Sequence, residues 1–149
     1  MLILLDIDGV LADCSHRLHY LKDKNYDKFY SAEEILNDNP IRSGLDLLYE
    51  LFPHNKVVLV TGRPYRTQEA TMAWLKREFR DDFEPEMIMR KDHDFRPSDV
   101  LKAEMIKEFT DGMEGETILF IDDDPKNVKA VENACRVQGV IFGSSRLGL

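Results

Sequence analysis

The stretch Met1-Leu-Ile-Leu-Leu-Asp6-Ile-Asp8-Gly9-Val10 joins an apolar run to two aspartates and a glycine. The run predicts a buried strand over Leu2–Leu5. Because side chains of extended chain alternate, Asp6 and Asp8 are expected to project to the same side at the carboxyl end of this strand. Two like charges side by side are costly to bury without a cation, and Gly9 permits the tight turn that follows. The stretch therefore predicts a strand end that holds a metal ion, activates a nucleophile, or does both.

The composition is typical of a soluble globular domain. The 149 residues suffice for one domain with a hydrophobic core, and 43% of them are hydrophobic. No apolar run is long enough to span a membrane, and the first run lacks the basic leader of a signal peptide. Cys14 and Cys135 form no CxxC pair, which predicts reduced thiols and a cytoplasmic location. The net charge of −8 argues against wrapping of nucleic acid around the whole surface, but it leaves room for a local basic cleft.

Five short apolar runs predict the strands of a parallel sheet, because several are too continuously apolar for a sheet with one wet face. Amphipathic segments between them predict helices, so the alternation indicates a doubly wound α/β fold, and we expect the strand order 3-2-1-4-5. The strands are expected over Leu2–Leu5, Lys56–Val60, Glu86–Met89, Thr117–Ile121 and Gly139–Phe142. Helices are expected to be capped by Ser43, Ser98 and Asp124, with a further helix over Thr67–Phe79.

Residues 14–42 interrupt this alternation between the first strand and its helix. A connection of this length is unusual in a compact domain, so we expect a small helical insert within a single domain covering residues 1–149. The segment holds many rings and cations, namely His16, Arg17, His19, Tyr20, Tyr26, Phe29 and Tyr30. Two interpretations stay open: the aromatic side chains pack on the body of the domain, or the insert is a lid over the strand ends that contacts substrate.

Polar residues follow four of the predicted strands. Ligands of open α/β sheets bind beyond the carboxyl ends of the strands, near the switch in strand order. Asp6, Asp8 and Asp122 are expected to converge there, and their hard oxygen atoms suit Mg²⁺. Each residue also has a simpler interpretation, such as a helix cap or, for Thr61-Gly62, a turn. Taken in order, the groups fit one site: they are Asp6 and Asp8, Thr61-Gly62-Arg63, Arg90-Lys91 and Asp122-Asp123-Asp124.

These groups resemble the four ordered motifs of the haloacid dehalogenase-like phosphohydrolases. The matching residues are Asp6-Ile-Asp8-Gly-Val, Val60-Thr61-Gly62-Arg63, Lys102 and Ile121-Asp122-Asp123. A narrower resemblance is to the 3′-phosphatase domain of phage-type polynucleotide kinases. It rests on His16-Arg17, Asp27-Lys-Phe-Tyr30, Met89-Arg90 and Asp94-Phe-Arg96-Pro97 followed by Lys102.

Two departures from the narrower pattern stand out. The sequence holds no GxxxxGK[ST] phosphate loop, so we expect no kinase domain in this chain. The fourth motif reads Asp122-Asp123-Asp124, where the kinase-linked phosphatases tend to have arginine in the third place. This second departure bears on the identity of the substrate rather than on the core chemistry.

The resemblance implies a Mg²⁺-dependent phosphomonoesterase that works through an aspartyl-phosphate. It implies that Asp6 is the nucleophile and that Asp8 protonates the leaving oxygen and then activates water. Thr61 and Gly62 would hydrogen-bond the phosphoryl oxygens, and Lys102 would neutralise their charge. The implied metal ligands are Asp6, Asp8 through its carbonyl, Asp122 and Asp123. The remaining candidates for substrate binding are Arg63, Arg90 and Arg96.

Three functions stay open as hypotheses. The first is hydrolysis of polynucleotide or nucleotide 3′-phosphates, with Arg90 and Arg96 against the nucleic-acid backbone; alternatively, Arg96 only pairs with Asp94 or Asp99 and stiffens its loop. The second is a small-molecule phosphatase such as a nucleotidase. The third is a non-enzymatic receiver-like phosphoacceptor domain, but Asp8 supplies an acid/base that a stable phosphoaspartate switch should lack. The expected partner is a phosphorylated substrate; the oligomeric state, and a separate kinase partner, stay open.

Overall fold

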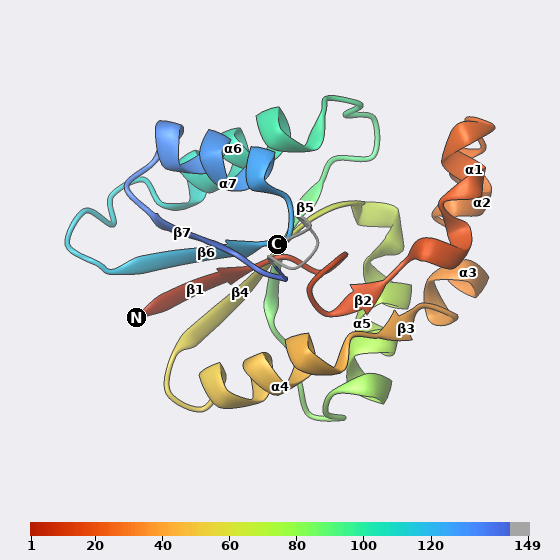
Figure 1. Cartoon of the computed structure of the whole chain (residues 1–149), viewed down its shortest axis with the longest axis horizontal. Coiled ribbons are helices and arrows are strands. Elements are labelled where there is room, and N and C mark those ends of the chain that lie inside the picture. Colours follow the sequence, from red (N-terminus) through yellow and green to blue (C-terminus); the bar gives the residue numbers. More distant parts are fainter. Residues whose placement is uncertain (144–149) are drawn as a thin grey trace.

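The structure, a computed structural model, describes residues 1–143 and has a five-stranded parallel sheet between two layers of helices (Figure 1). The strands are β1 (Leu2–Leu5), β4 (Lys56–Pro64), β5 (Glu86–Arg90), β6 (Ile118–Asp122) and β7 (Gln138–Ile141). They lie in the order β5-β4-β1-β6-β7, and each neighbouring pair is parallel. Counted along the chain, this is the predicted order 3-2-1-4-5, so the doubly wound α/β fold is confirmed.

Helices cover both faces of the sheet. They are α4 (Arg42–Leu51), α5 (Gln68–Glu78), α6 (Ser98–Phe109) and α7 (Pro125–Ala134). Ile3 and Leu5 of the central strand β1 pack in the core on the α4 and α5 side, whereas Leu2 and Leu4 pack in the core on the α6 and α7 side. Both sets of alternating side chains are therefore buried, which explains why the run is continuously apolar.

The helix starts agree only in part with the expected caps. Asp124 caps α7, because its carboxylate accepts the backbone N–H of Lys126 and Pro125 takes the first helical position. The two serine caps are wrong. Helix α4 begins at Arg42, so Ser43 lies inside it, and α6 begins at Ser98 itself after Pro97. Neither helix has a side-chain cap, so backbone geometry sets both starts.

Strand β4 continues beyond its predicted end at Val60. It runs through Thr61 to Pro64, and its register with β5 shifts between Thr61 and Pro64. Such an irregularity re-aims the side chains that it carries. The extension keeps Thr61 and Gly62 in extended chain instead of the turn that they resemble in sequence.

Residues 14–42 form the predicted small helical insert, beside the carboxyl ends of the strands (Figure 1). A two-stranded antiparallel ladder of β2 (Ala12–Asp13) and β3 (Asn39–Pro40) joins the ends of the insert. Between them lie a 3-10 turn over Ser15–Arg17 and three short helices, α1 (His19–Lys22), α2 (Tyr26–Phe29) and α3 (Ala32–Leu36). Within residues 1–143, every helix is too short or too polar to cross a membrane.

Candidate active site

Asp6 lies at the carboxyl end of β1 and is nearly fully buried, with 4% of its surface exposed. Its backbone N–H donates to the carbonyl of Ile121, so the residue is fixed against β6. Its Oδ1 atom accepts the backbone N–H of Ile7 at 2.9 Å and the ammonium of Lys102 at 2.8 Å. Burial raises the pKa of Asp6 well above its usual value, and the charge of Asp122 adds to the rise although Lys102 opposes it.

Lys102 links the two buried carboxylates of the site. It extends from α6, and its Nζ atom lies 2.8 Å from Asp6 Oδ1 and 2.7 Å from Asp122 Oδ2. Asp122 is the last residue of β6 and is fully buried. Burial alone would lower the pKa of the Lys102 ammonium, but attraction to both carboxylates raises it. The side-chain amide of Asn127, on α7, also donates to Asp122; we did not predict this contact, since nothing near Asn127 in the sequence signals it.

A cluster of three carboxylates provides a place for a cation. Oxygen atoms of Asp6, Asp122 and Asp123 lie within 4.8 Å of one another. Asp6 and Asp122 share the Lys102 ammonium, so these two buried carboxyl groups face one cation between them. Hard carboxylate oxygens of this kind fit Mg²⁺. The donor set of the protein thus suits the metal that the sequence implies.

Gly9 makes room for the cluster. Its φ angle is +87°, in the left-handed region that favours glycine. A Cβ atom at this position would lie 2.1 Å from Asp123 Oδ2. The Asp123 carboxylate therefore lies directly against the backbone of the turn after β1, and glycine is needed there both for its conformation and for its lack of a side chain.

Asp8 is held by arginine rather than by lysine. Arg63, 1% exposed at the end of β4, donates from Nε to Asp8 Oδ2 at 3.0 Å and from Nη2 to Asp8 Oδ1 at 2.7 Å. Burial would raise the pKa of Asp8, but the Arg63 guanidinium lowers it below its usual value. Arg63 therefore holds both oxygen atoms of the Asp8 carboxylate.

Asp38 is a buried residue of the site that sequence reasoning missed. Its carboxylate accepts hydrogen bonds from Arg17 Nε at 2.8 Å and from Arg63 Nη2 at 2.9 Å. His16 Nε2 lies 2.7 Å from Asp38 Oδ1. Arg17 also approaches Asp8 Oδ1, at 3.5 Å. In sequence Asp38 looks like an ordinary turn aspartate before Asn39-Pro40. The only sign of its role is indirect: Arg17 and Arg63 need an acidic partner if they are buried.

Thr61 and Gly62 reach the same end of the sheet. Thr61 is fully buried, and its Oγ1 atom accepts the backbone N–H of Arg63 at 3.0 Å. The carbonyl of Gly62 accepts a hydrogen bond from Arg90 Nε at 2.7 Å. A cavity of about 540 Å³ opens next to Asp8, Gly9 and Asp123. The structure thus places Thr61 and Gly62 at the same end of the sheet as Asp6, on the neighbouring strand.

Arg90 and Arg96 bind within the loop that follows β5. Arg90 Nη1 donates to the carbonyls of Asp94 at 3.0 Å and of Arg96 at 2.7 Å. Arg96 pairs with Asp94 at 2.7 Å and also contacts Glu104. The pairing of Arg96 with Asp94 is the alternative that the sequence left open. Contact of either arginine with a substrate stays a prediction.

Comparison with solved structures finds the same fold in several proteins. A chain in the structure of the Pnkp1/Rnl/Hen1 RNA repair complex matches with a TM-score of 0.67 at 21% identity, over 95% of this chain and 42% of that chain. A haloacid dehalogenase-like hydrolase from Streptococcus pneumoniae matches with a TM-score of 0.68 at 15% identity, over 94% and 83%. A HAD family enzyme from Bacteroides thetaiotaomicron, solved as a magnesium complex, gives 0.55 at 16% identity, over 98% and 96%.

These likenesses show the fold, and the chain spans less than half the length of the RNA repair protein that it matches. Comparison with curated proteins found no match. The model of one family, described as the polynucleotide kinase PNKP phosphatase domain, matches residues 1–136. That range includes Asp6, Asp8, Lys102 and Asp122, the residues around which the site is built. The chain therefore belongs to the haloacid dehalogenase-like phosphatases, in the family of PNKP phosphatase domains.

Proposed function

We propose that this chain is a Mg²⁺-dependent phosphomonoesterase that removes 3′-phosphates from polynucleotides or nucleotides through an aspartyl-phosphate on Asp6. The observation that carries the proposal is the meeting of Asp6, Asp122 and Asp123 at one point, with Lys102 between the first two. Membership of the phosphatase family supports the reaction class. The RNA repair structures support nucleic-acid ends, RNA ends among them, as the substrate. They also support repair proteins as partners of this chain.

Asp6 is placed to attack phosphorus. Its Oδ1 atom carries both of its hydrogen bonds, which hold the carboxylate in one orientation and leave Oδ2 for the attack. A bond forms from Oδ2 to phosphorus while the bond to the substrate 3′-oxygen breaks. Lys102 neutralises charge on the phosphoryl group, and Thr61 and Gly62 hydrogen-bond its oxygens. Asp6, Asp122 and Asp123 would hold Mg²⁺, which would supply further positive charge near the phosphoryl group when bound.

Asp8 moves the proton in both half-reactions. It gives a proton to the departing 3′-oxygen, and it then takes one from the water that attacks the phosphorus of the aspartyl-phosphate. That second step releases inorganic phosphate and restores the Asp6 carboxylate. Arg63 fixes the direction of the Asp8 carboxylate and favours its ionised form, which is the form that accepts the proton from water. Arg63 is thus a positioning residue in this proposal.

The insert acts in the proposal as a lid-like part of a single domain that spans residues 1–149. Arg17 and Asp38, both within residues 14–42, reach the Asp8 carboxylate directly or through Arg63. The insert is therefore built into the support of the site instead of resting on its surface. A cytoplasmic location is also part of the proposal, and the two free thiols of Cys14 and Cys135 fit it.

The test is phosphate release from one oligonucleotide carrying the phosphate at its 3′ end, compared with the isomer carrying it at its 5′ end and with a nucleoside 3′-monophosphate. We expect turnover of the 3′-phosphates that depends on Mg²⁺.

Asp6→Asn should reduce this turnover by several orders of magnitude while the circular dichroism spectrum is retained, because an amide is not a nucleophile. Preference for non-nucleotide phosphates would favour the small-molecule phosphatase instead, and Asp6→Asn activity within about tenfold of the wild type would exclude Asp6 as the nucleophile.

A further inference from the structure

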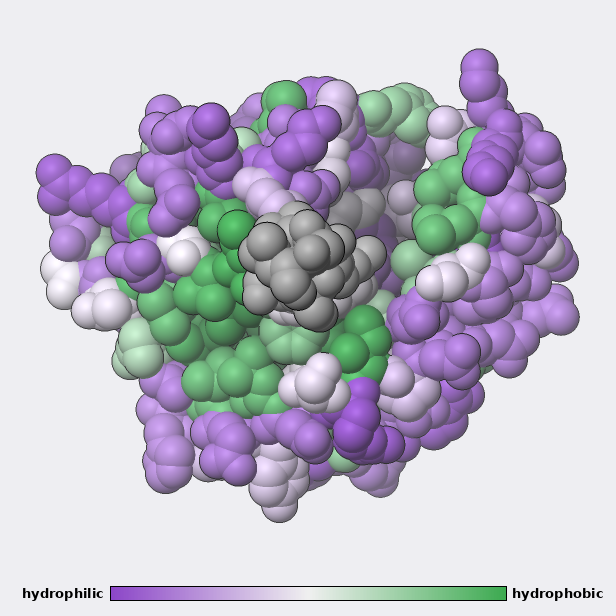
Figure 2. All heavy atoms as spheres, in the orientation of Figure 1, coloured by the Kyte–Doolittle hydropathy of each residue, from purple (hydrophilic) through white to green (hydrophobic). Residues whose placement is uncertain are grey.

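A second cleft lies between the insert and the loop of residues 91–97 that follows β5. It has a volume of about 130 Å³, which is too small for a drug-sized ligand but suits one flat ring system. In Figure 2 the surface is hollowed between the insert and the body of the domain. Residues on both sides line the cleft, among them Tyr26, Tyr30, Pro64, Arg66, Arg90 and Phe95.

One wall is a loop that is held in place yet exposes a phenylalanine. Arg90 binds the carbonyls on both sides of Phe95, those of Asp94 and Arg96, and Arg96 pairs with the Asp94 carboxylate. Phe95 lies between these anchored residues and is 77% exposed. An apolar ring that is kept in water by an anchored loop is a feature of binding surfaces, since the ring gains nothing from this position in the folded protein itself.

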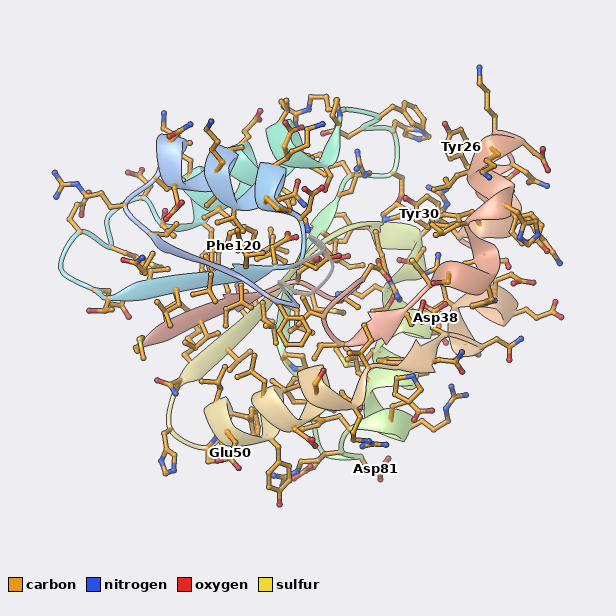
Figure 3. The ribbon with its side chains drawn as sticks, in the orientation of Figure 1. Tyr26, Tyr30, Asp38, Glu50, Asp81 and Phe120 are labelled. Carbon is orange, nitrogen blue, oxygen red and sulfur yellow. The ribbon has the colours of Figure 1, made fainter. Side chains whose placement is uncertain are left out.

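The other wall is the short helix α2 of the insert. Tyr26 and Tyr30 are four residues apart and therefore lie on the same side of the helix, which faces the body of the domain (Figure 3). The Arg66 guanidinium lies 5.3 Å above the centre of the Tyr30 ring and covers it. Tyr26 remains 43% exposed. Tyr26 and Phe95 are thus the two most exposed aromatic side chains that line the cleft.

The cleft borders the candidate active site. Arg90, which lines the cleft, binds the carbonyl of Gly62, a residue proposed to hold the phosphoryl group. Tyr30 follows Phe29, whose carbonyl accepts a hydrogen bond from Arg17 beside Asp8. Burial raises the pKa of the Tyr30 hydroxyl, and Arg90 and Asp8 both act on it through their charges. The cleft is therefore joined to the candidate active site through the contact between Arg90 and Gly62.

We propose that this cleft is a nucleobase subsite, in which the base of the nucleotide that bears the scissile phosphate stacks on Tyr26 and Phe95. The proposal rests on the function proposed above and goes beyond it, because it assigns a binding role to two residues outside the site built around Asp6. Aromatic rings stack on every base, so this subsite recognises the presence of a base and not its identity. It therefore selects nucleotide ends over other phosphate esters while accepting any sequence.

The experiment compares two oligonucleotide 3′-phosphates that differ only at the last residue, one with a normal base and one abasic. The wild type should have the lower KM for the substrate with the base. Tyr26→Ala and Phe95→Ala should each raise that KM by about 5-fold to 150-fold, the range for loss of one stacking ring. Neither change should alter the KM for the abasic substrate. Tyr49→Ala removes a tyrosine that is 61% exposed on α4 and serves as the matched control, with both KM values unchanged.

The outcomes separate this proposal from the function on which it rests. If the wild type hydrolyses both 3′-phosphates with the same KM, or if the two variants change both substrates equally, the subsite is wrong and the 3′-phosphatase function stands. If the wild type hydrolyses neither, the proposed function fails and the subsite falls with it. Both side chains are exposed, so loss of folding in the variants is not expected, and thermal unfolding checks this directly.

Discussion

Arg63 holds Asp8 at two points, with Nε 3.0 Å from Oδ2 and Nη2 2.7 Å from Oδ1. Such a fork fixes both the position and the plane of the carboxylate. The guanidinium is itself fixed, because Nη1 donates to Thr71 and Nη2 also donates to Asp38. The direction of the proposed acid and base is therefore set by a chain of contacts that reaches from the sheet into the insert.

We predict that Arg63→Lys impairs catalysis although it keeps the positive charge. A lysine ammonium cannot make the planar two-point contact, so Asp8 would be misplaced by a fraction of an ångström or more. We expect kcat to fall by about 10-fold to 100-fold, with little change in KM for a 3′-phosphorylated oligonucleotide. Because the Arg63 hydrogen bonds help to lower the pKa of Asp8, their loss should also move the acidic limb of the pH profile of kcat to higher pH. A variant with unchanged kcat and pH profile would mean that the fork has no part in catalysis.

We predict that Asp38→Asn destabilises the whole domain. The change retains the shape of the side chain but removes one of the two acids that pair with buried Arg17 and Arg63, leaving Asp8 as the other. Loss of one partner from a buried ion pair costs about 3–5 kcal/mol, a large part of the stability of a domain of this size. Urea unfolding measures the difference. Glu84→Gln, which removes the acid of the exposed pair with Lys76, is the control and should leave the midpoint nearly unchanged.

We predict that Gly9→Ala weakens metal binding. The added methyl group would meet the Asp123 carboxylate and push it away from Asp6 and Asp122. The Mg²⁺ concentration for half-maximal activity should rise by about tenfold or more, and the Mg²⁺-induced rise in thermal midpoint should shrink.

Ca²⁺ should not replace Mg²⁺ in the wild type, because its longer bonds misplace the reacting groups. Full activity of the wild type after exhaustive chelation would contradict the metal site.

We predict an unusually acidic carboxyl group at Asp94. The hydrogen bonds from the Arg96 side chain and backbone lower its pKa to about 2. Since this pKa lies below that of an unfolded aspartate, about 3.9, the pair stabilises the fold above that pH, and the contribution is lost as the pH falls towards 2. Carboxyl NMR titration measures the value, and Arg96→Ala should return it towards 4. A wild-type Asp94 that titrates near 4 would show that the loop carrying Phe95 is not anchored in this way.

The sequence predicts the sheet and the acidic centre well, because both depend on local patterns. A buried central strand has to be continuously apolar; Asp6 directly follows one such strand, and Asp122 is the last residue of its neighbour. Once the strand order is known, two neighbouring strand ends have to meet. The predicted order is therefore enough to place these two carboxylates together.

The support of Asp8 could not be read in the same way. Asp38 is 21 residues from Arg17 and 25 residues from Arg63, so no local pattern connects the three. The contacts of the cations near the third strand could not be read from the sequence either. Arg90 and Arg96 look like a basic patch in sequence, but they bind carbonyls and an acid of their own loop. Charge counts do not reveal which cations are already paired.

The one tryptophan of the chain lies where the insert joins the body of the domain. Trp74 is fully buried in α5, and its indole Nε1 donates to the carbonyl of Asp38 at 2.8 Å. Its fluorescence therefore reports on this junction without any added label. Release of the insert would expose the ring to water and move the emission to longer wavelength, so opening of the insert and its timescale can be followed in the native protein.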